Sequence, residues 1–180
     1  IIAADLGINQ LLIREIARKK EDAGKYFMNA FVIKAFFSLL ACMFIILLLN
    51  ALNYPRDTRH VVYAIWIFMI ISNFTDLFYS VFRAFEKMFY DSFIKIVRMA
   101  ILTSAGLYIL FRGYGVFAFS LAFIFVELIM LLLAYLITSR KFIKITFELD
   151  FRFMKDLVKT AYPLGIAFIF SSLYFYIATV

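Results

Sequence analysis

Long apolar stretches alternate with short polar segments along the chain. Runs long enough to cross a bilayer, for which about 20 mostly apolar residues are needed, occupy positions 27–52, 60–82, 93–111, 113–139 and 160–180. The pattern predicts five membrane-spanning helices, the last of them cut short. Positions 1–13 are too few to cross alone, and we expect them to be the end of a further span. We interpret the chain as an internal piece of a longer membrane protein.

The composition favours an all-α polytopic membrane protein built as a helical bundle. Of the 180 residues, 66% are hydrophobic and only 17% are charged, whereas soluble domains keep about a quarter charged. The net charge of +7 comes from basic residues that flank the apolar runs. This placement favours contact with anionic lipid head groups over nucleic acid, so we expect membrane lipids as partners.

The sequence carries no pattern typical of a catalytic or metal site. Its single cysteine, Cys42, lies in an apolar run, and no zinc or redox spacing is present. A phosphate-binding loop, a nucleophile elbow and a metalloprotease motif are also missing from the sequence. We therefore expect no enzymatic activity, no cofactor and no metal.

Basic residues are divided unevenly between the two sets of alternate loops. One set holds three, in the segments 53–59 and 112–115, and the other holds thirteen. Because short basic loops stay in the cytoplasm, we expect the richer set to be cytoplasmic and the protein to lie in the plasma or inner membrane. The thirteen residues are Arg14, Arg18, Lys19, Lys20, Lys25, Arg83, Lys87, Arg140, Lys141, Lys144, Arg152, Lys155 and Lys159.

The segment before the last span has a different pattern. Over 143–153 apolar and polar residues alternate strictly, which is typical of a strand, but a lone strand would have no partner in a helical bundle. We therefore predict a connector that lies on the membrane surface. Asp150 is expected to cap a helix whose Phe153, Leu157 and Ala161 share one face.

Four ionisable residues lie inside the apolar runs: Lys34, Asp76, Arg98 and Glu127. A charge at the centre of a bilayer costs roughly 2.5–3.5 kcal/mol on insertion scales, so it usually faces a partner, a cavity or a pathway. Counted from the cytoplasmic edge of each span, the first three lie roughly 10 Å deep at 1.5 Å per residue, and Glu127 lies deeper. We expect Lys34, Asp76 and Arg98 to face a common interior, with Lys34–Asp76 and Arg98–Glu127 as feasible pairs.

Helical spacing indicates that other polar residues share these faces. Asn73, Asp76, Ser80 and Arg83 are three, four and three residues apart, so they form a stripe on one face of their helix. A similar stripe on the next helix consists of Asp91, Lys95 and Arg98. Both stripes are expected to point into the bundle.

The buried charges allow three compatible interpretations. They can be ion pairs that hold helices in register, a modest contribution of about 0.6–2 kcal/mol. They can line a hydrated, net basic cavity for an anionic solute. Alternatively, Asp76 or Glu127 can couple transport to protons or cations.

Short motifs resemble those of a known transporter family. The stretches ADLGIN at 4–9 and LIREIAR at 12–18, FRAFEKM at 82–88 and YPLGI at 162–166 are similar to segments of the polysaccharide biosynthesis protein family. These are flippases for lipid-linked oligosaccharides in the multidrug/oligosaccharidyl-lipid/polysaccharide exporter superfamily. The order and spacing of the motifs agree with that family over nearly the whole chain.

The resemblance implies a fragment of an exporter with two lobes of six or more helices. Residues 1–138 would form the first lobe from a partial second helix to the sixth, 139–158 the cytoplasmic amphipathic connector, and 159–180 the truncated first helix of the second lobe. Family members move an isoprenoid diphosphate-linked glycan to the outer leaflet by alternating access. The implied partners are this anionic substrate and the enzymes that assemble the glycan.

The family's central basic cavity gives the buried charges candidate roles. Lys34 and Arg98 would contact the diphosphate or acidic sugars, with Arg14 and Arg83 near the cytoplasmic mouth. The remaining two candidates, for pairing or ion coupling, are Asp76 and Glu127.

Three other functions remain open. A drug/cation antiporter of the same superfamily would need a cavity dominated by carboxylates, whereas basic residues in these spans are at least as numerous as acidic ones. A membrane-embedded glycan polymerase or ligase would need a long outer loop with catalytic residues, and the outer loops here are short. A scaffold without transport activity is the least specific alternative.

Overall fold

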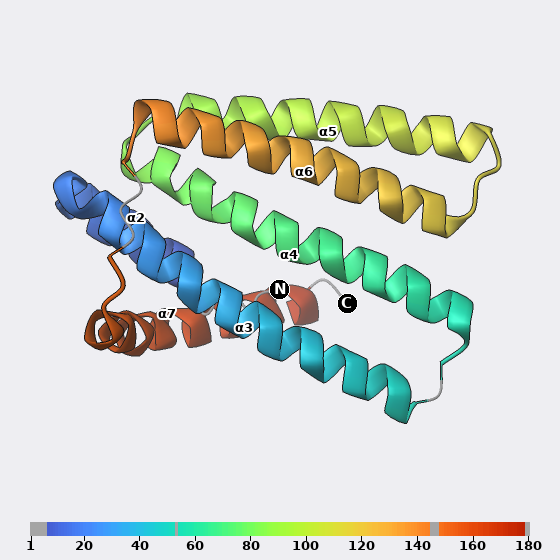
Figure 1. The fold of residues 1–180 in the computed structure, drawn as a ribbon, viewed down its shortest axis with the longest axis horizontal. Helices are drawn as coiled ribbons and strands as arrows, with labels where there is room; N and C mark the ends of the chain where they lie inside the picture. The colour runs from blue at the N-terminus through green and yellow to red at the C-terminus, as the bar shows by residue number, and fades with distance from the viewer. Residues whose placement is uncertain (1–6, 53, 145–147, 179–180) are drawn as a thin grey trace.

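A computed structural model describes residues 7–52, 54–144 and 148–178, with the side chains of 57, 164, 168, 169 and 171–178 left out. In these residues the chain forms helices joined by short turns (Figure 1). The helices are α2 (Ile8–Arg18), the 3₁₀ turn η1 (Lys20–Asp22), α3 (Ala23–Ala51), α4 (Arg56–Ala84), α5 (Met88–Phe111), α6 (Val116–Lys141) and α7 (Phe151–Ala178).

Four of these helices confirm the predicted spans. Within the described residues, α3, α4, α5 and α6 are long and apolar enough to cross a membrane. The protein is therefore an all-α, multi-pass membrane protein. The fifth predicted span, 160–180, falls within α7 and beyond, and much of it lies outside the described side chains.

Helix α4 is the centre of the bundle and contacts α2, α3, α5 and α6. The α3–α4 and α5–α6 turns lie at one end of the long helices, and α2, the α4–α5 turn and the α6–α7 connector lie at the other (Figure 1). We call this second end the basic end, because it carries the thirteen basic residues of the richer loop set. The alternation of loops predicted from the sequence is thus present in the fold.

Two helix ends adopt the same tight turn. At the end of α5, the amide of Tyr114 donates to the carbonyl of Ile109, 3.2 Å away, and Gly113 has φ 71°. At the end of α4, the amide of Lys87 donates to the carbonyl of Phe82 at 2.9 Å, and Glu86 has φ 61°. These are Schellman turns, which need one residue in the left-handed conformation. Glycine takes this conformation readily, whereas Glu86 does so under strain.

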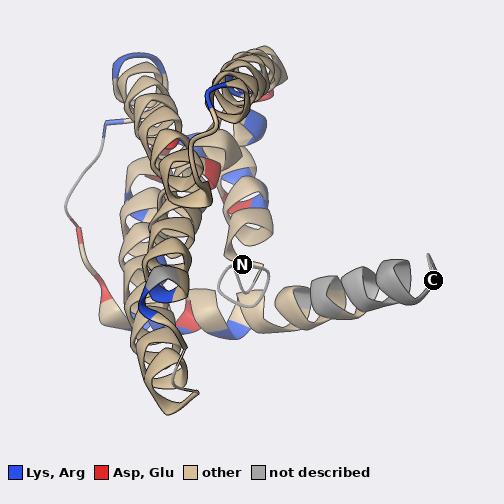
Figure 2. Cartoon of the chain, turned by 90° about the vertical axis from the view of Figure 1, so that its right-hand side faces the viewer, with Lys and Arg blue, Asp and Glu red and all other residues tan. Residues whose placement is uncertain are grey.

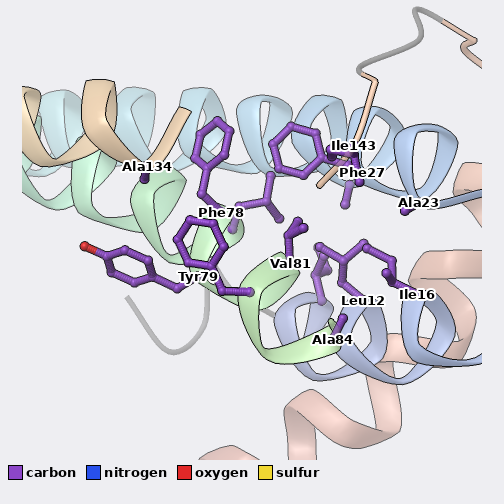
Figure 3. Packing of buried hydrophobic residues seen from close by; sticks show 14 of the residues in the cluster. Leu12, Ile16, Ala23, Phe27, Phe78, Tyr79, Val81, Ala84, Ala134 and Ile143 are labelled. Atoms are coloured by element: carbon purple, nitrogen blue, oxygen red, sulfur yellow. The ribbon is translucent and has the colours of Figure 1, made fainter. Parts of the chain in front are cut away.

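Helix α2 is a short amphipathic helix at the basic end. It begins at Ile8 because Gly7, at φ 74°, adopts a left-handed conformation at its start. Its apolar face packs against α3 and α4, and Leu12 and Ile16 lie near Phe27 and Ala84 (Figure 3). Positions 8–13 lie in α2 and positions 1–6 lie outside the described residues, so the expectation that positions 1–13 are the end of a span stays a prediction. The side chains of α2 that are buried are Ile8, Leu11, Leu12 and Ile16.

The start of α7 agrees with the predicted cap. The carboxylate Oδ1 of Asp150 accepts hydrogen bonds from the amides of Arg152, at 3.0 Å, and Phe153, at 3.1 Å. On the face predicted to be apolar, Leu157 and Ala161 are buried and Phe153 is half-buried. Residues 148–150 have no regular secondary structure, and Figure 2 shows acidic positions on this connector just before α7 begins.

Candidate functional site

Lys34 has no exposed surface, although it lies in the apolar helix α3. Its ammonium Nζ donates hydrogen bonds to the side-chain Oδ1 of Asn73, at 2.9 Å, and to the backbone carbonyl of Asn73, at 3.2 Å. Asn73 is itself buried on α4. A lysine is almost never fully buried unless its charge is compensated. The burial of Lys34 therefore marks it as a candidate functional residue.

Arg98 and Glu127 form the second buried group. Nε of Arg98 lies 2.8 Å from Oε2 of Glu127, which has no exposed surface, and the Arg98 side chain is 21% exposed. Arg98 also donates through its Nη2 to the hydroxyl of Ser72 on α4, at 3.2 Å, and its guanidinium lies over the ring of Phe68. The group therefore ties α4, α5 and α6 together and confirms the predicted Arg98–Glu127 pair.

The two buried groups lie at one level of the bundle. Lys34 reaches α4 at Asn73, and Arg98 reaches α4 at the neighbouring residue Ser72. Because these residues are adjacent on α4, they face different sides of that helix at nearly equal height. The common level predicted for Lys34 and Arg98 is present, and the ion pair brings Glu127 within reach of it.

The polar stripe on α4 points into the bundle, as the spacing predicts. Asn73 and Ser80 are buried, and Asp76 and Arg83 are half-buried. The hydroxyl of Ser80 donates to the backbone carbonyl of Asp76 at 2.9 Å. Asp76 lies one helical turn from Asn73 on this face, and its pairing with Lys34 stays a prediction.

Closer to the basic end, Asp91 on α5 joins two cations. Its Oδ2 lies 2.8 Å from Nε of Arg83, and its Oδ1 lies 2.7 Å from Nζ of Lys95. Asp91 is buried, whereas Arg83 and Lys95 are each about one-third exposed. Two cations and one carboxylate leave the cluster with a formal charge of +1. The cluster joins the end of the predicted stripe on α4 to the start of the stripe on α5.

Arg14 occupies a more open position at the basic end. Its side chain is 49% exposed, and its Nη2 lies 2.8 Å from Oε1 of Glu15. It lines a pocket of about 270 Å³ between α2, α3 and α7, together with Glu15, Tyr26, Asp156 and Thr160. Arg14 is thus separate from the Lys34 and Arg98 groups.

An apolar pocket of about 550 Å³ lies among α3, α4 and α6. Its walls include Phe31 and Phe74, whose ring centroids are 4.7 Å apart, and Phe27 and Phe78, 4.9 Å apart. None of the ionisable residues discussed above lines this pocket. In the described part of the chain, no group of three His, Cys, Asp or Glu side chains is arranged to hold a metal ion.

The chain as a whole matches a known protein family. The model of a family described as "Polysaccharide biosynthesis protein" matches residues 1–180, the full length of the chain. The chain belongs to the polysaccharide biosynthesis protein family. Its role therefore lies in the synthesis or export of polysaccharide. Comparisons with curated proteins and with solved structures found no match.

In this polysaccharide biosynthesis protein, the sequence did not reveal the roles of two buried asparagines, Asn73 and Asn29. Asn73 was placed in the polar stripe but was not recognised as the partner of Lys34. Asn29 was not singled out, although it has no exposed surface and bonds to the α6–α7 connector. Its position in the sequence between Met28 and Ala30, in an otherwise apolar run, was the available signal, because a polar residue there needs a partner.

Proposed function

We propose that the chain is part of a flippase that moves an isoprenoid diphosphate-linked oligosaccharide from the cytoplasmic to the outer leaflet by alternating access. Residues 1–138 are the first lobe, 139–158 the connector and 159–180 the start of a second lobe. Membership of the family supports a role in the polysaccharide pathway. The buried charges support translocation of the anionic substrate as the step within that pathway. Lys34, fully buried in an apolar helix, is the observation that carries the proposal.

The charges favour an anionic substrate. Asp91 holds two cations, Arg83 and Lys95, which leaves that cluster with a formal charge of +1. A diphosphate carries oxygens of the kind that Asp91 and Glu127 now present to Arg83 and Arg98. It can therefore replace a carboxylate as the partner of a guanidinium, which binds phosphate and carboxylate alike.

The cations suggest an order of contact along the pathway. Arg14 is the most exposed of the four proposed substrate residues, Arg83 is about one-third exposed, Arg98 is mostly buried and Lys34 fully buried. A head group that enters at the basic end meets them in this order. Asp76 and Glu127 take the charge back when the substrate leaves, which is also the way in which they would couple transport to an ion.

In this proposal the basic end faces the cytoplasm and the protein lies in the plasma or inner membrane. Enzymes that assemble the glycan supply the substrate on the cytoplasmic side. Thirteen basic residues against three support this orientation, because loops rich in Lys and Arg are retained on the cytoplasmic side. Labelling from outside intact cells tests it: a cysteine at Arg112 should react with an impermeant maleimide, and one at Lys87 should not.

Export by the complete protein tests the function. The double variant Lys34→Ala/Arg98→Ala should insert into the membrane and fail to export glycan. The matched control is Lys87→Ala/Arg112→Ala, which also removes one lysine and one arginine, but from exposed positions, and it should export normally. Normal export by the first variant would contradict the proposal. Lost extrusion of a cationic drug with intact glycan export would indicate the antiporter, and accumulation of unpolymerised glycan outside the cell would indicate the polymerase.

A further inference from the structure

Asn29 makes three hydrogen bonds from a fully buried position on α3. Its amide Nδ2 donates to the carbonyl of Lys25, at 2.8 Å on the same helix, and to the carbonyl of Glu148 on the connector, at 3.0 Å. Its Oδ1 accepts from the amide of Asp150 at 3.1 Å. One side chain thus bonds the connector on both a donor and an acceptor, 119 and 121 residues away in sequence.

Two of these bonds satisfy backbone groups of the connector that have no helical partner. Glu148 and Asp150 lie in a segment without regular secondary structure, and an intramolecular hydrogen bond contributes about 0.5–1.5 kcal/mol to stability. Asn29 supplies one donor and one acceptor to the connector backbone, as the backbone of a neighbouring strand would. Removal of its amide therefore leaves unsatisfied groups on both sides of the contact.

The preceding turn of α3 also contacts the connector and the start of α7. Nζ of Lys25 lies 3.8 Å from Oδ2 of Asp150 and 5.3 Å from the ring centroid of Phe153. The rings of Tyr26 and Phe153 meet edge to face, with centroids 4.9 Å apart. Residues 25–29 of α3 thus contact the connector, the cap of α7 and its first turn.

We propose that Asn29 is a clasp that fixes the entry of α7 to α3. With the clasp closed, residues 148–153 move with α3 as one body and do not behave as a free linker. The ion pair of Lys25 is long and partly exposed, and such pairs contribute little, so the asparagine is the main element. The clasp operates on the fold and is independent of the substrate that the protein carries.

The competing explanation is that apolar packing alone holds α7. Met154, Leu157 and Ala161 are buried, and α7 contacts both α2 and α3. If this packing were sufficient, the loss of the three hydrogen bonds would leave the start of α7 in place. Amide exchange distinguishes the two explanations, because the Asp150 amide donates to Asn29 and the amides of Arg152 and Phe153 donate to the Asp150 carboxylate.

Hydrogen–deuterium exchange of the full-length protein in nanodiscs tests the clasp. In Asn29→Ala, the amides of 150–153 should exchange at least about tenfold faster, the loss that corresponds to 1.4 kcal/mol of protection. Amides of 77–82 in α4 should be unchanged, which shows that the bundle remains folded. The matched control is Asn50→Ala, at the opposite end of the same helix, where the side chain is exposed and accepts from Arg59; it should leave 150–153 unchanged.

Asn29→Asp provides a second variant of nearly the same size. It keeps an acceptor for the Asp150 amide but loses both N–H donors, so it should also speed exchange over 148–153. Unchanged exchange in both variants, or an equal increase in Asn50→Ala, would overturn the proposal. Faster exchange throughout α4 as well would show general loss of structure and count against a local clasp.

Discussion

Arg98 on α5 and Glu127 on α6 are joined by an ion pair of 2.8 Å in the interior of two apolar, membrane-length helices. Neither residue is adjacent to a helix end, so the pair holds the two helices in register along their lengths. Removal of one partner leaves a charge in a poorly solvated place, whereas removal of both leaves none. The pair is therefore well suited to a double-mutant cycle.

Replacement of Arg98 by Met should destabilise the protein more than replacement of Glu127 by Met. The first variant leaves Glu127, which is fully buried, without its cation. The second leaves Arg98, which is 21% exposed and keeps its bond to Ser72. We expect losses of about 3 and about 1.5 kcal/mol, and recovery of most of the loss in the double Met variant. The free energy of unfolding is measured in detergent for the natural protein, the two single variants and the double variant. Strictly additive losses would show that the two residues do not interact.

The strained turn at the end of α4 gives an independent prediction of stability. Glu86 has φ 61°, a conformation that costs an L-residue roughly 1–2 kcal/mol, whereas glycine gives up about 0.5–1 kcal/mol of chain entropy. Glu86→Gly should therefore stabilise the protein by about 0.5–1 kcal/mol in thermal unfolding. Lys87→Gly, at φ −99°, should destabilise it, and a loss of stability in both variants would contradict the assignment of strain.

The cap of α7 should make part of the stability depend on pH. The amide of Phe153, with that of Arg152 and the charge of Lys25, holds the pKa of Asp150 below its ordinary value. A carboxylate with a lowered pKa stabilises the fold fully above its unfolded pKa of about 4, and this contribution is lost as the pH falls through the folded value. Asp150→Asn keeps a capping oxygen but does not titrate. The melting temperature of the natural protein should exceed that of Asp150→Asn above about pH 5 and lose this advantage below about pH 4; a constant difference would contradict the prediction.

Apolar length and charge spacing were sufficient to predict the helices and one buried pair. The runs over 27–52 and 60–82 became α3 and α4, and the opposite charges of Arg98 and Glu127 became a contact because both lie inside apolar helices. Asp150 was recognisable because capping depends on the next three residues only. These features are local or are forced by the cost of a lone charge in hydrocarbon.

The features that the sequence did not predict depend on neighbours far along the chain. Asn29 bonds to Glu148 and Asp150 only because the connector returns to α3, and no local pattern records that path. Gly7 adopts a left-handed conformation at the start of α2, which an apolar count cannot detect. Asn73 was one of several polar residues on its face, and its spacing alone did not show that its side chain and carbonyl both accept from Lys34.

The central claim is that the buried charges handle an anionic lipid-linked glycan and do more than hold helices together. Translocation of an isoprenoid diphosphate-linked oligosaccharide by full-length Arg98→Met/Glu127→Met protein in proteoliposomes tests it most directly, because that variant removes the charges without leaving either one unpaired. If its melting temperature stays near that of the natural protein, we predict a translocation rate at least about tenfold lower, the effect of losing one charge-assisted contact of about 1.4 kcal/mol. Translocation at the natural rate by this folded variant would contradict the claim and leave the Arg98–Glu127 pair a structural contact.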